Sequence, residues 1–204
     1  MNTVAENHPQ RGSRRAQWVK LGLLALLFAA PIIAAFWWKP TGFVNSGELV
    51  TPARPLSNIV FATMDGAPFP LADLKSKWTL IYIGIQPCEE VCEKNLYKIR
   101  QVRLAQTKHA YRVQSVFVTP VTTSDAAVAA LLSRYPGVIG LRADDRAMAA
   151  LVDEFTYKQA KPPEAGRVYV VDPLGNLMMS YPPDADPSAM RKDLNRLLKV
   201  SQVG

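Results

Sequence analysis

The amino-acid sequence predicts an α/β domain, a mixed β-sheet with helices on both faces, that follows one N-terminal transmembrane helix. Three observations support this prediction. An uncharged apolar stretch occupies residues 21–38. From about residue 58 onwards, strand-like and helix-like segments alternate, as they do where helices connect the strands of a sheet. A β-hairpin and a final helix then close the pattern.

The apolar stretch approaches the length of about 20 residues that spans the hydrocarbon core of a bilayer. Four basic residues precede it, and positive flanks stay in the cytoplasm: Arg11, Arg14, Arg15 and Lys20. A cleaved signal peptide has a shorter apolar run of about 7–15 residues before a small-residue cleavage site, so we expect a retained anchor. Residues 1–20 then form a cytoplasmic tail, and residues beyond 38 lie on the extracytoplasmic (periplasmic) side of the inner membrane.

Residues 39–57 are rich in Pro, Gly and polar residues and lack periodicity, which predicts a tether before a folded domain at residues 58–204. The domain opens with a short strand over residues 58–63, a turn, and the helical-turn fragment LADLK. Residues 79–85 form a continuous apolar run, the pattern of a central strand that is buried on both faces.

A long helix is expected to begin at Cys88, because neither Gly nor Pro occurs between Cys88 and about His109. Apolar residues recur at helical spacing in this stretch: Val91, Leu96, Ile99, Val102 and Leu104. The stretch also carries a basic series, which we interpret as a solvated face: Lys94, Lys98, Arg100, Arg103, Lys108 and Arg112.

The remaining segments continue the alternation. We expect a strand at 112–119, a helix from the N-cap Ser124 to Tyr135, a strand at 138–141 and a helix at 145–155. A hairpin at 168–181 follows, and Asp186 caps a last helix at 187–200. The expected order, β-α-β-α-β-α-β-β-α, matches a thioredoxin-like fold.

The charge balance excludes one class of function. The chain has 24 Lys and Arg residues against 17 Asp and Glu residues. A nucleic-acid binder would cluster its basic residues among aromatic ones, and it would not be held outside the membrane. We therefore expect no nucleic-acid partner.

The only two cysteines form a C-x3-C motif, Cys88 and Cys92, at the start of the expected helix. This spacing places both side chains on one face, where they can pair or share a soft metal ion. A helix N-terminus favours the thiolate, whereas Glu89, Glu90 and Glu93 oppose it. Two buried, inert cysteines are the alternative. A purely structural disulfide would close only a very small loop, so it would stabilise the fold little by restricting the unfolded chain.

Three segments of the sequence resemble the Sco (SenC) family, and the resemblance covers about residues 58–200. The segments are PFPLADLKSKW, TLIYIGIQPCEEVCEKNLYKIRQ and VYVVDPLGNLMMSY. The family consists of membrane-anchored, thioredoxin-like domains that carry copper on a C-x3-C pair and a distant histidine. They deliver copper to cytochrome c oxidase or keep its cysteines reduced.

The resemblance implies that Cys88 and Cys92 are a redox pair and Cu(I) ligands. It also implies a partner that is a cytochrome c oxidase subunit or another assembly factor. The family histidine corresponds to residues 161–166, where this sequence reads KPPEAG. His8 lies in the tail, and His109 lies about 25 Å from Cys92 along a helix. Two thiolates suit Cu(I), whereas Cu(II) also prefers imidazole, so we expect copper as Cu(I).

Three functions remain open at this point. The first is a Sco-like assembly factor that binds Cu(I) or reduces thiols of a partner. The second is a general thiol-disulfide oxidoreductase in which Cys88 attacks and Cys92 resolves, although that class uses C-x-x-C. The third is a non-catalytic, membrane-tethered interaction module that keeps only the fold and a structural disulfide. The sequence leaves open which applies, and so whether the chain is an enzyme.

Overall fold

The computed structural model describes residues 14–37, 45–84, 88–156 and 161–201. It divides into two units, Met1–Val44 and Asn45–Gly204, which we describe separately. The described part of the first unit is one helix, α1 (Arg14–Trp37). Within it, Ala16–Ala34 has a mean hydropathy of 1.8 and is long and apolar enough to cross a membrane. Trp38, the last residue of the predicted span, lies outside the described residues.

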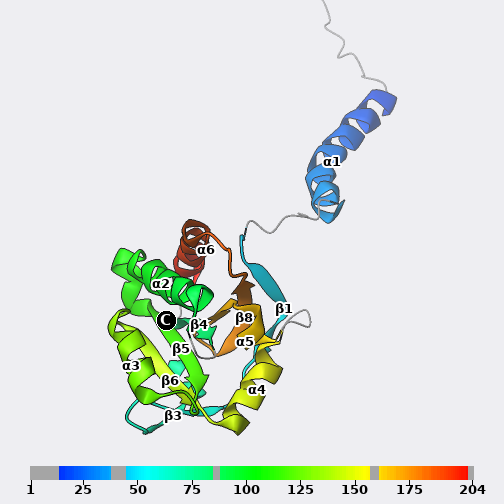
Figure 1. The fold of residues 1–204 in the computed structure, drawn as a ribbon. Helices are drawn as coiled ribbons and strands as arrows, with labels where there is room; N and C mark the ends of the chain where they lie inside the picture. Colours follow the sequence, from blue (N-terminus) through cyan, green and yellow to red (C-terminus); the bar gives the residue numbers. More distant parts are fainter. Residues whose placement is uncertain (1–13, 38–44, 85–87, 157–160, 202–204) are drawn as a thin grey trace, which may run out of the picture. The chain divides into compact units, whose positions relative to one another are not determined.

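The second unit is built on an eight-stranded mixed sheet with the order β1-β8-β7-β4-β5-β6-β2-β3 (Figure 1). β4, β5 and β6 run parallel, and the other neighbouring pairs are antiparallel. The strands are β1 (Glu48–Pro55), β2 (Val60–Ala62), β3 (Pro68–Pro70), β4 (Trp78–Ile83), β5 (Val113–Pro120), β6 (Val138–Ala143), β7 (Val168–Val171) and β8 (Asn176–Tyr181).

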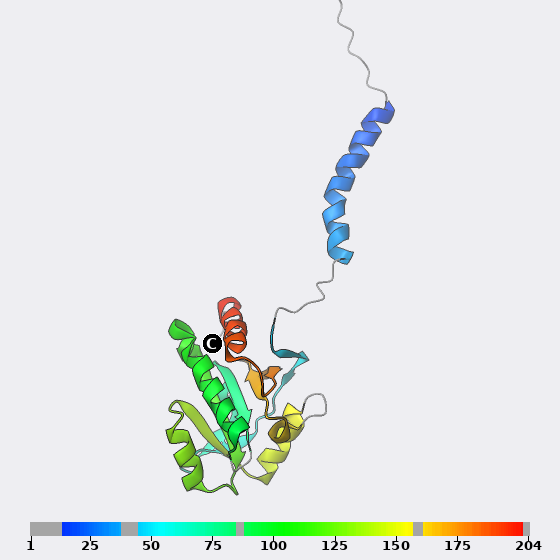
Figure 2. The same cartoon turned by 45° about the horizontal axis from the view of Figure 1, so that its top comes forward.

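Helices cover both faces of this sheet (Figures 1 and 2). Leu80 of β4 packs in a core with residues of α2, α3 and α6, whereas its neighbour Ile81 packs in a second core with residues of α4 and η1. The helices are η1 (Leu71–Leu74), α2 (Glu90–Leu104), η2 (Thr107–Arg112), α3 (Asp125–Ser133), α4 (Asp145–Phe155), α5 (Pro162–Ala165) and α6 (Pro187–Val200). The predicted thioredoxin-like mixed sheet is confirmed.

The N-terminal boundary of the folded unit differs from the prediction. Residues 45–57, expected to belong to a tether, are part of the compact unit, and β1 pairs with the outer edge of β8. The Asp193 carboxylate accepts hydrogen bonds from the Ser46 and Gly47 amides at 2.7 and 3.1 Å. Most of β1 is exposed, so it has no hydrophobic alternation that would reveal it in the sequence.

The long helix also differs from the prediction at both ends. α2 begins at Glu90, so Cys88 lies just before it, and it ends at Leu104 rather than near His109. His109 belongs to the separate 3-10 helix η2, and Thr107 at the junction has a positive φ of 48°. The β-branched side chain of Thr107 made this break hard to predict, because such residues seldom adopt that conformation.

Candidate functional site

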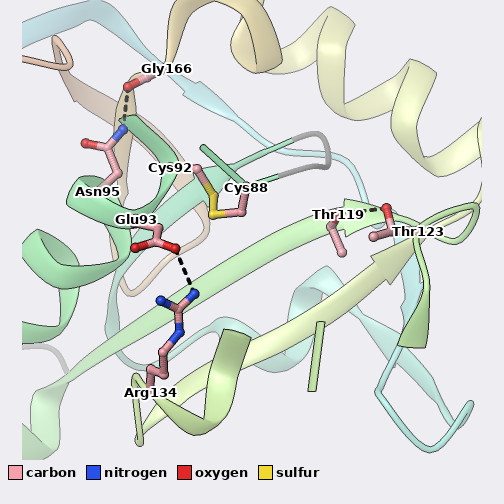
Figure 3. The surroundings of a disulfide bond; sticks show 8 residues. All are labelled: Cys88, Cys92, Glu93, Asn95, Thr119, Thr123, Arg134 and Gly166. Atoms are coloured by element: carbon pink, nitrogen blue, oxygen red, sulfur yellow. Dashed lines mark hydrogen bonds and ion pairs between the residues drawn. A yellow bond between two sulfur atoms is a disulfide. The ribbon is translucent and has the colours of Figure 1, made fainter. Parts of the chain in front are cut away.

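The two cysteines lie at the N-terminal end of α2 and are joined by a disulfide, with 5.2 Å between their Cα atoms (Figure 3). Cys92, in the first turn of α2, is 5% exposed, and Cys88 is half-buried. The C-x3-C spacing therefore brings the side chains together as predicted. Cys88 is therefore the more exposed residue of the pair.

The sheet places this pair at the carboxyl end of its central strand. β4 is buried along its whole length between β5 and β7. Its pairing with β5 extends to Gly84, whose amide donates to the Val118 carbonyl at 3.0 Å. A Cβ on Gly84 would lie 2.9 Å from the Phe117 ring and 3.0 Å from the Tyr82 ring. Glycine thus lets the backbone pass these rings just before the cysteines.

The acidic residues of the first turn of α2 are paired with cations. Glu90 contacts Lys94 at 2.5 Å, and the hydrogen bond and charge of Lys94 lower the pKa of Glu90. Glu93 contacts Arg134 at 2.8 Å, an ion pair visible beside the disulfide in Figure 3. Lys94 and Arg134 therefore offset part of the negative charge of the glutamates, which disfavours a cysteine thiolate. Both pairs are solvent-exposed, so the offset is modest.

One side of the cysteine pair is formed by residues 119–125, which link β5 to α3 and which we call the Arg142-bound segment. The Arg142 side chain is 6% exposed and ion-pairs with Asp125. It also donates to the Val121 carbonyl at 2.8 Å and to the Thr123 carbonyl. Thr119 and Thr123 of this segment lie in the surroundings of the disulfide (Figure 3). A buried guanidinium therefore holds the segment at several points.

The other side is formed by residues 161–167, which contain α5 and lead into β7, and which we call the Asn95-bound segment. Asn95 of α2 is fully buried, and its Nδ2 donates to the Gly166 carbonyl at 2.7 Å (Figure 3). Glu164 in α5 is exposed. The segment to which the resemblance assigned the family histidine is thus bound to α2 one turn after Cys92.

Tyr82 connects the site to the core. It is buried in the same apolar cluster as Cys92, and its ring stacks on Phe117 with 5.9 Å between centroids. Burial raises the pKa of the Tyr82 hydroxyl, and a hydrogen bond with the Asn95 side chain partly opposes that rise.

The described residues offer a small donor set for a metal. Among them, no group of three or more His, Cys, Asp or Glu side chains could hold a metal ion. His109 follows the far end of α2 and is not brought to the cysteines. After reduction, the two cysteine sulfurs would be soft donors that fit Cu(I).

Sequence reasoning missed three residues that organise this site: Asn95, Arg142 and Gly166. Asn95 carried a weak signal, because it is an uncharged polar residue beside Leu96 on the buried side of a helix that starts at the cysteines. Arg142 and Gly166 gave no such signal, because their contacts come from elements distant in the chain.

Comparison with known proteins gives consistent matches. The family model described as transmembrane-like, thioredoxin-like, C-terminal domain matches residues 78–201. An SCO2-like protein of Rickettsia conorii is 25% identical over 175 residues, covering 72% of this chain and 85% of that protein. The mitochondrial SCO2 homologue of Mus musculus is 30% identical over 120 residues, covering 55% of this chain and 47% of the mouse protein.

Structural comparison agrees with the sequence matches. The crystal structure of yeast Sco1 with copper bound superposes with a TM-score of 0.62 at 21% identity, covering 72% of this chain and 90% of that one. A likeness at this identity shows the shared fold. Taken with the sequence relatives and the matched family model, it leads to one conclusion: the chain belongs to the transmembrane-like, thioredoxin-like C-terminal domain family and, within that fold, to the Sco/SenC proteins.

Proposed function

We propose that this chain is a membrane-anchored, Sco-like factor that assists cytochrome c oxidase assembly through Cys88 and Cys92. The observation that carries the proposal is the C-x3-C pair at the end of a buried central strand, close enough to form a disulfide, in a Sco/SenC chain. The partner would be an oxidase subunit or another assembly factor. The pair would act by thiol reduction of that partner, by Cu(I) binding, or by both.

The unequal burial of the two cysteine residues supports Cys88 as the attacking residue of the thiol reaction. In the reduced chain, the Cys88 thiolate attacks a disulfide of the partner, forming a mixed disulfide and releasing one partner thiolate. Cys92 then attacks the Cys88 sulfur, which releases the second partner thiolate and closes the Cys88–Cys92 disulfide. Two electrons pass to the partner, and the protons lost by the two cysteines balance those taken up by the partner thiolates.

Copper would be a cargo of the same pair in its reduced state. Two thiolate sulfurs suit Cu(I), whose soft character and low coordination they match. The sequence of residues 161–166 supplies no imidazole, which Cu(II) prefers. The yeast Sco1 structure, described as copper-bound, supports copper as the metal by analogy.

Copper titration of the full chain, purified in detergent and fully reduced, tests this proposal. We expect one Cu(I) per chain and no tight Cu(II) binding, with Cu(I) binding abolished in Cys88→Ser and Cys92→Ser. His109→Ala is the matched control, and it should leave the stoichiometry unchanged. Tight Cu(II) binding by the native chain would contradict the donor set, and the absence of copper in both states would favour thiol exchange alone.

A gain-of-function variant examines the alignment of the Asn95-bound segment with the family histidine. Glu164→His places an imidazole in α5, and we expect it to create Cu(II) binding, read as a new absorption band on titration. The control is Glu154→His, a carboxylate of α4 that contacts Ser57. Equal Cu(II) binding by both variants would show that the segment does not occupy the histidine position.

Partner trapping distinguishes an assembly factor from a general oxidoreductase, which the accessible Cys88 also fits. In Cys92→Ser, the mixed disulfide on Cys88 cannot be resolved and should accumulate. A Sco-like factor should trap one main membrane-protein client, whereas a general oxidoreductase should trap many. If no mixed disulfide forms and the thiols resist alkylation after reduction, the pair is structural and the chain is an interaction module.

We also propose that α1 is a retained anchor that crosses the membrane once, with residues 1–20 in the cytoplasm and the second unit on the periplasmic side. The support is a helix long and apolar enough to cross a membrane, with the four basic residues in its first turns and just before it. A reporter fused after residue 60 should be active only outside the cytoplasm. A shortened, membrane-free form beginning near residue 36 would instead indicate a cleaved signal.

A further inference from the structure

We infer that Asn95 is a positioning residue that couples the redox state of Cys88 and Cys92 to the Asn95-bound segment, residues 161–167. This inference rests on the proposed thiol function and names how that site is regulated. The inference is based on two contacts with Gly166. One comes from Val91, within the loop that the disulfide closes, and the other comes from Asn95, in the next turn of α2.

The first contact comes from Val91, which lies between the two cysteines in the sequence. A Cβ placed on Gly166 would be 3.0 Å from Val91 Cγ1 and 3.3 Å from Pro183 Cγ. Gly166 also has a φ of +56°, in the region that favours glycine. The segment therefore fits closely against the residue whose backbone position the disulfide constrains.

The second contact is the buried hydrogen bond from Asn95 to the Gly166 carbonyl, 2.7 Å long. Asn95 follows Cys92 by three residues, almost one helical turn. Its Oδ1 accepts no hydrogen bond from the part of the chain that the structure describes. Besides its hydrogen bond with the Tyr82 hydroxyl, the amide has one attachment among the described residues, and that attachment is to the Asn95-bound segment.

Reduction opens the disulfide that constrains the backbone of Val91. When a dithiol reduces the chain, the Cys88–Cys92 bond takes up two electrons and two protons to give two thiols, and the dithiol becomes a disulfide. The residues between the cysteines are then no longer closed in a ring, so the packing of Val91 on Gly166 is less constrained. By linkage, a contact that is stronger in the disulfide form raises the equilibrium constant for disulfide formation.

The sheet explains why this segment, rather than a distant one, is coupled to the cysteines. Tyr82, near the end of β4, pairs with Val168 of β7, so residues 161–167 lead into the strand directly beside the cysteine-bearing end of β4. The Arg142-bound segment lies on the opposite side, next to β5, and its attachments come from β6 rather than from α2. It provides an internal comparison.

The test measures the equilibrium between the disulfide and dithiol forms of the full chain, in detergent, against dithiothreitol. Asn95→Leu removes the donor while keeping the size of the side chain. We expect it to lower the equilibrium constant for disulfide formation about fivefold to tenfold, a tenfold change being about 30 mV. Asn95→Gln, which can still donate, should recover part of the loss.

The matched control is Gln114→Leu. Gln114 also donates an amide hydrogen bond to a backbone carbonyl, that of Leu74 at 2.8 Å. It lies at the start of β5, beside the start of β4, whereas the cysteines follow the end of β4. Its removal should leave the equilibrium with dithiothreitol unchanged. If Asn95→Leu does not fold, Gly166→Ala disturbs the same contact from the segment side and should shift the equilibrium in the same direction.

Hydrogen exchange measures an effect that would be absent if Asn95 had a purely structural role. In the native chain, amides of residues 161–168 should exchange faster in the dithiol form than in the disulfide form, whereas those of residues 119–125 should not change. In Asn95→Leu, the redox difference at residues 161–168 should disappear.

Two outcomes separate this inference from the function on which it rests. If dithiothreitol fails to open the native disulfide, the thiol function is wrong and the coupling falls with it. If the disulfide opens normally but neither the equilibrium nor the exchange pattern responds to Asn95→Leu or Gly166→Ala, Asn95 is only a structural residue and the thiol function stands.

Discussion

The Arg142-bound segment and the Asn95-bound segment flank the same cysteine pair, but they are held in different ways. The first is fixed by a buried guanidinium that contacts Asp125 and two backbone carbonyls. The second is attached to α2 by one amide hydrogen bond and by the packing of Val91 on Gly166. At the end of the second segment, Arg167 also donates to the Ser180 hydroxyl of β8 and ion-pairs with Glu48 of β1.

This difference indicates which side of the site can respond to chemistry at the sulfurs. The Arg142-bound segment draws its attachments from β6, so it would keep its position in either redox state. The Asn95-bound segment draws its attachments at Gly166 from the same helix as Cys92. The following predictions test this contrast, from the largest expected effect to the smallest.

Arg142→Leu should cause the largest loss of stability. It leaves the Val121 and Thr123 carbonyls without their buried donor, and we expect the free energy of unfolding to fall by about 3 kcal/mol. The measurement is the urea midpoint of the second unit's unfolding. Arg146→Leu, at an exposed arginine of α4, is the control and should change stability by less than about 0.5 kcal/mol. Equal losses would remove the contrast between the two segments.

Gly166→Ala should have an intermediate effect. The positive φ of Gly166 costs a side chain about 1 kcal/mol, and the contacts with Val91 and Pro183 should raise the total loss to about 2 kcal/mol. Gly66→Ala isolates the first part, because Gly66 also has a positive φ, +84°, and its Cβ position has no described atom within 4 Å. If the two variants lose the same stability, Val91 does not pack tightly on the Asn95-bound segment.

Lys98 allows a pH-dependent test of the same side. Burial lowers the pKa of Lys98, partly opposed by the charge of Asp184, and its Nζ donates to the Pro183 carbonyl. Burying the charged Lys98 amine reduces the stability of the folded state. This loss is present below the lowered pKa and disappears as pH rises toward the ordinary value of 10.5. The native chain should therefore gain stability relative to Lys98→Met as pH rises through the lowered pKa toward 10.5.

Urea midpoints of both proteins across this pH range give the comparison. Lys94→Met, at an exposed lysine of the same helix, controls for the loss of a positive charge. A constant difference between the native chain and Lys98→Met at all pH values would mean that Lys98 is as hydrated in the folded chain as in the unfolded one.

Arg134→Gln should have the smallest effect. Its ion pair with Glu93 is exposed on both sides, so we expect no measurable change in the urea midpoint. The double variant Glu93→Gln/Arg134→Gln should behave in the same way. A clear loss of stability in the single variant, recovered in the double variant, would show that the charge pair, rather than the buried contacts, holds the first turn of α2.

Much of the fold could be predicted because its elements carry local signals. The apolar run of β4 predicted a strand that is buried on both faces, and the structure confirms it. Ser124 and Asp186 cap α3 and α6 through their side chains, as their positions in the sequence indicated. Helix capping and hydrophobic periodicity depend on residues within one or two turns, which a single sequence displays in full.

β1 shows the limit of these local signals. It contains two prolines and is mostly exposed, so its sequence is similar to that of a linker. It becomes a strand because β8 offers a free edge and because the buried carboxylate of Asp193 binds the preceding backbone at Ser46 and Gly47. Asp193 lies far away in the sequence, and no pattern around residue 46 reveals it.

The basic series of α2 and η2 gives a second case. We interpreted it as a solvated face, and for two members this was wrong. Lys98 and Arg112 are each 8% exposed. Lys98 donates to Pro183, and Arg112 donates to the carbonyls of Leu198 and Ser201, at the end of α6. A charged residue on a helix has the same appearance in the sequence whether it faces water or the carbonyls of another element.

The sequence alone determined that a C-x3-C pair follows a buried strand and sits at the start of a helix, because strand burial and helix periodicity are written in neighbouring residues. Only the tertiary structure decided what surrounds that pair. Arg142 and Gly166 reach the site because β6 and β7 lie beside the β5 and β4 strands in the sheet. Their contacts with residues 121–125 and with Asn95 join distant parts of the chain, and such contacts form only when the whole sheet is assembled.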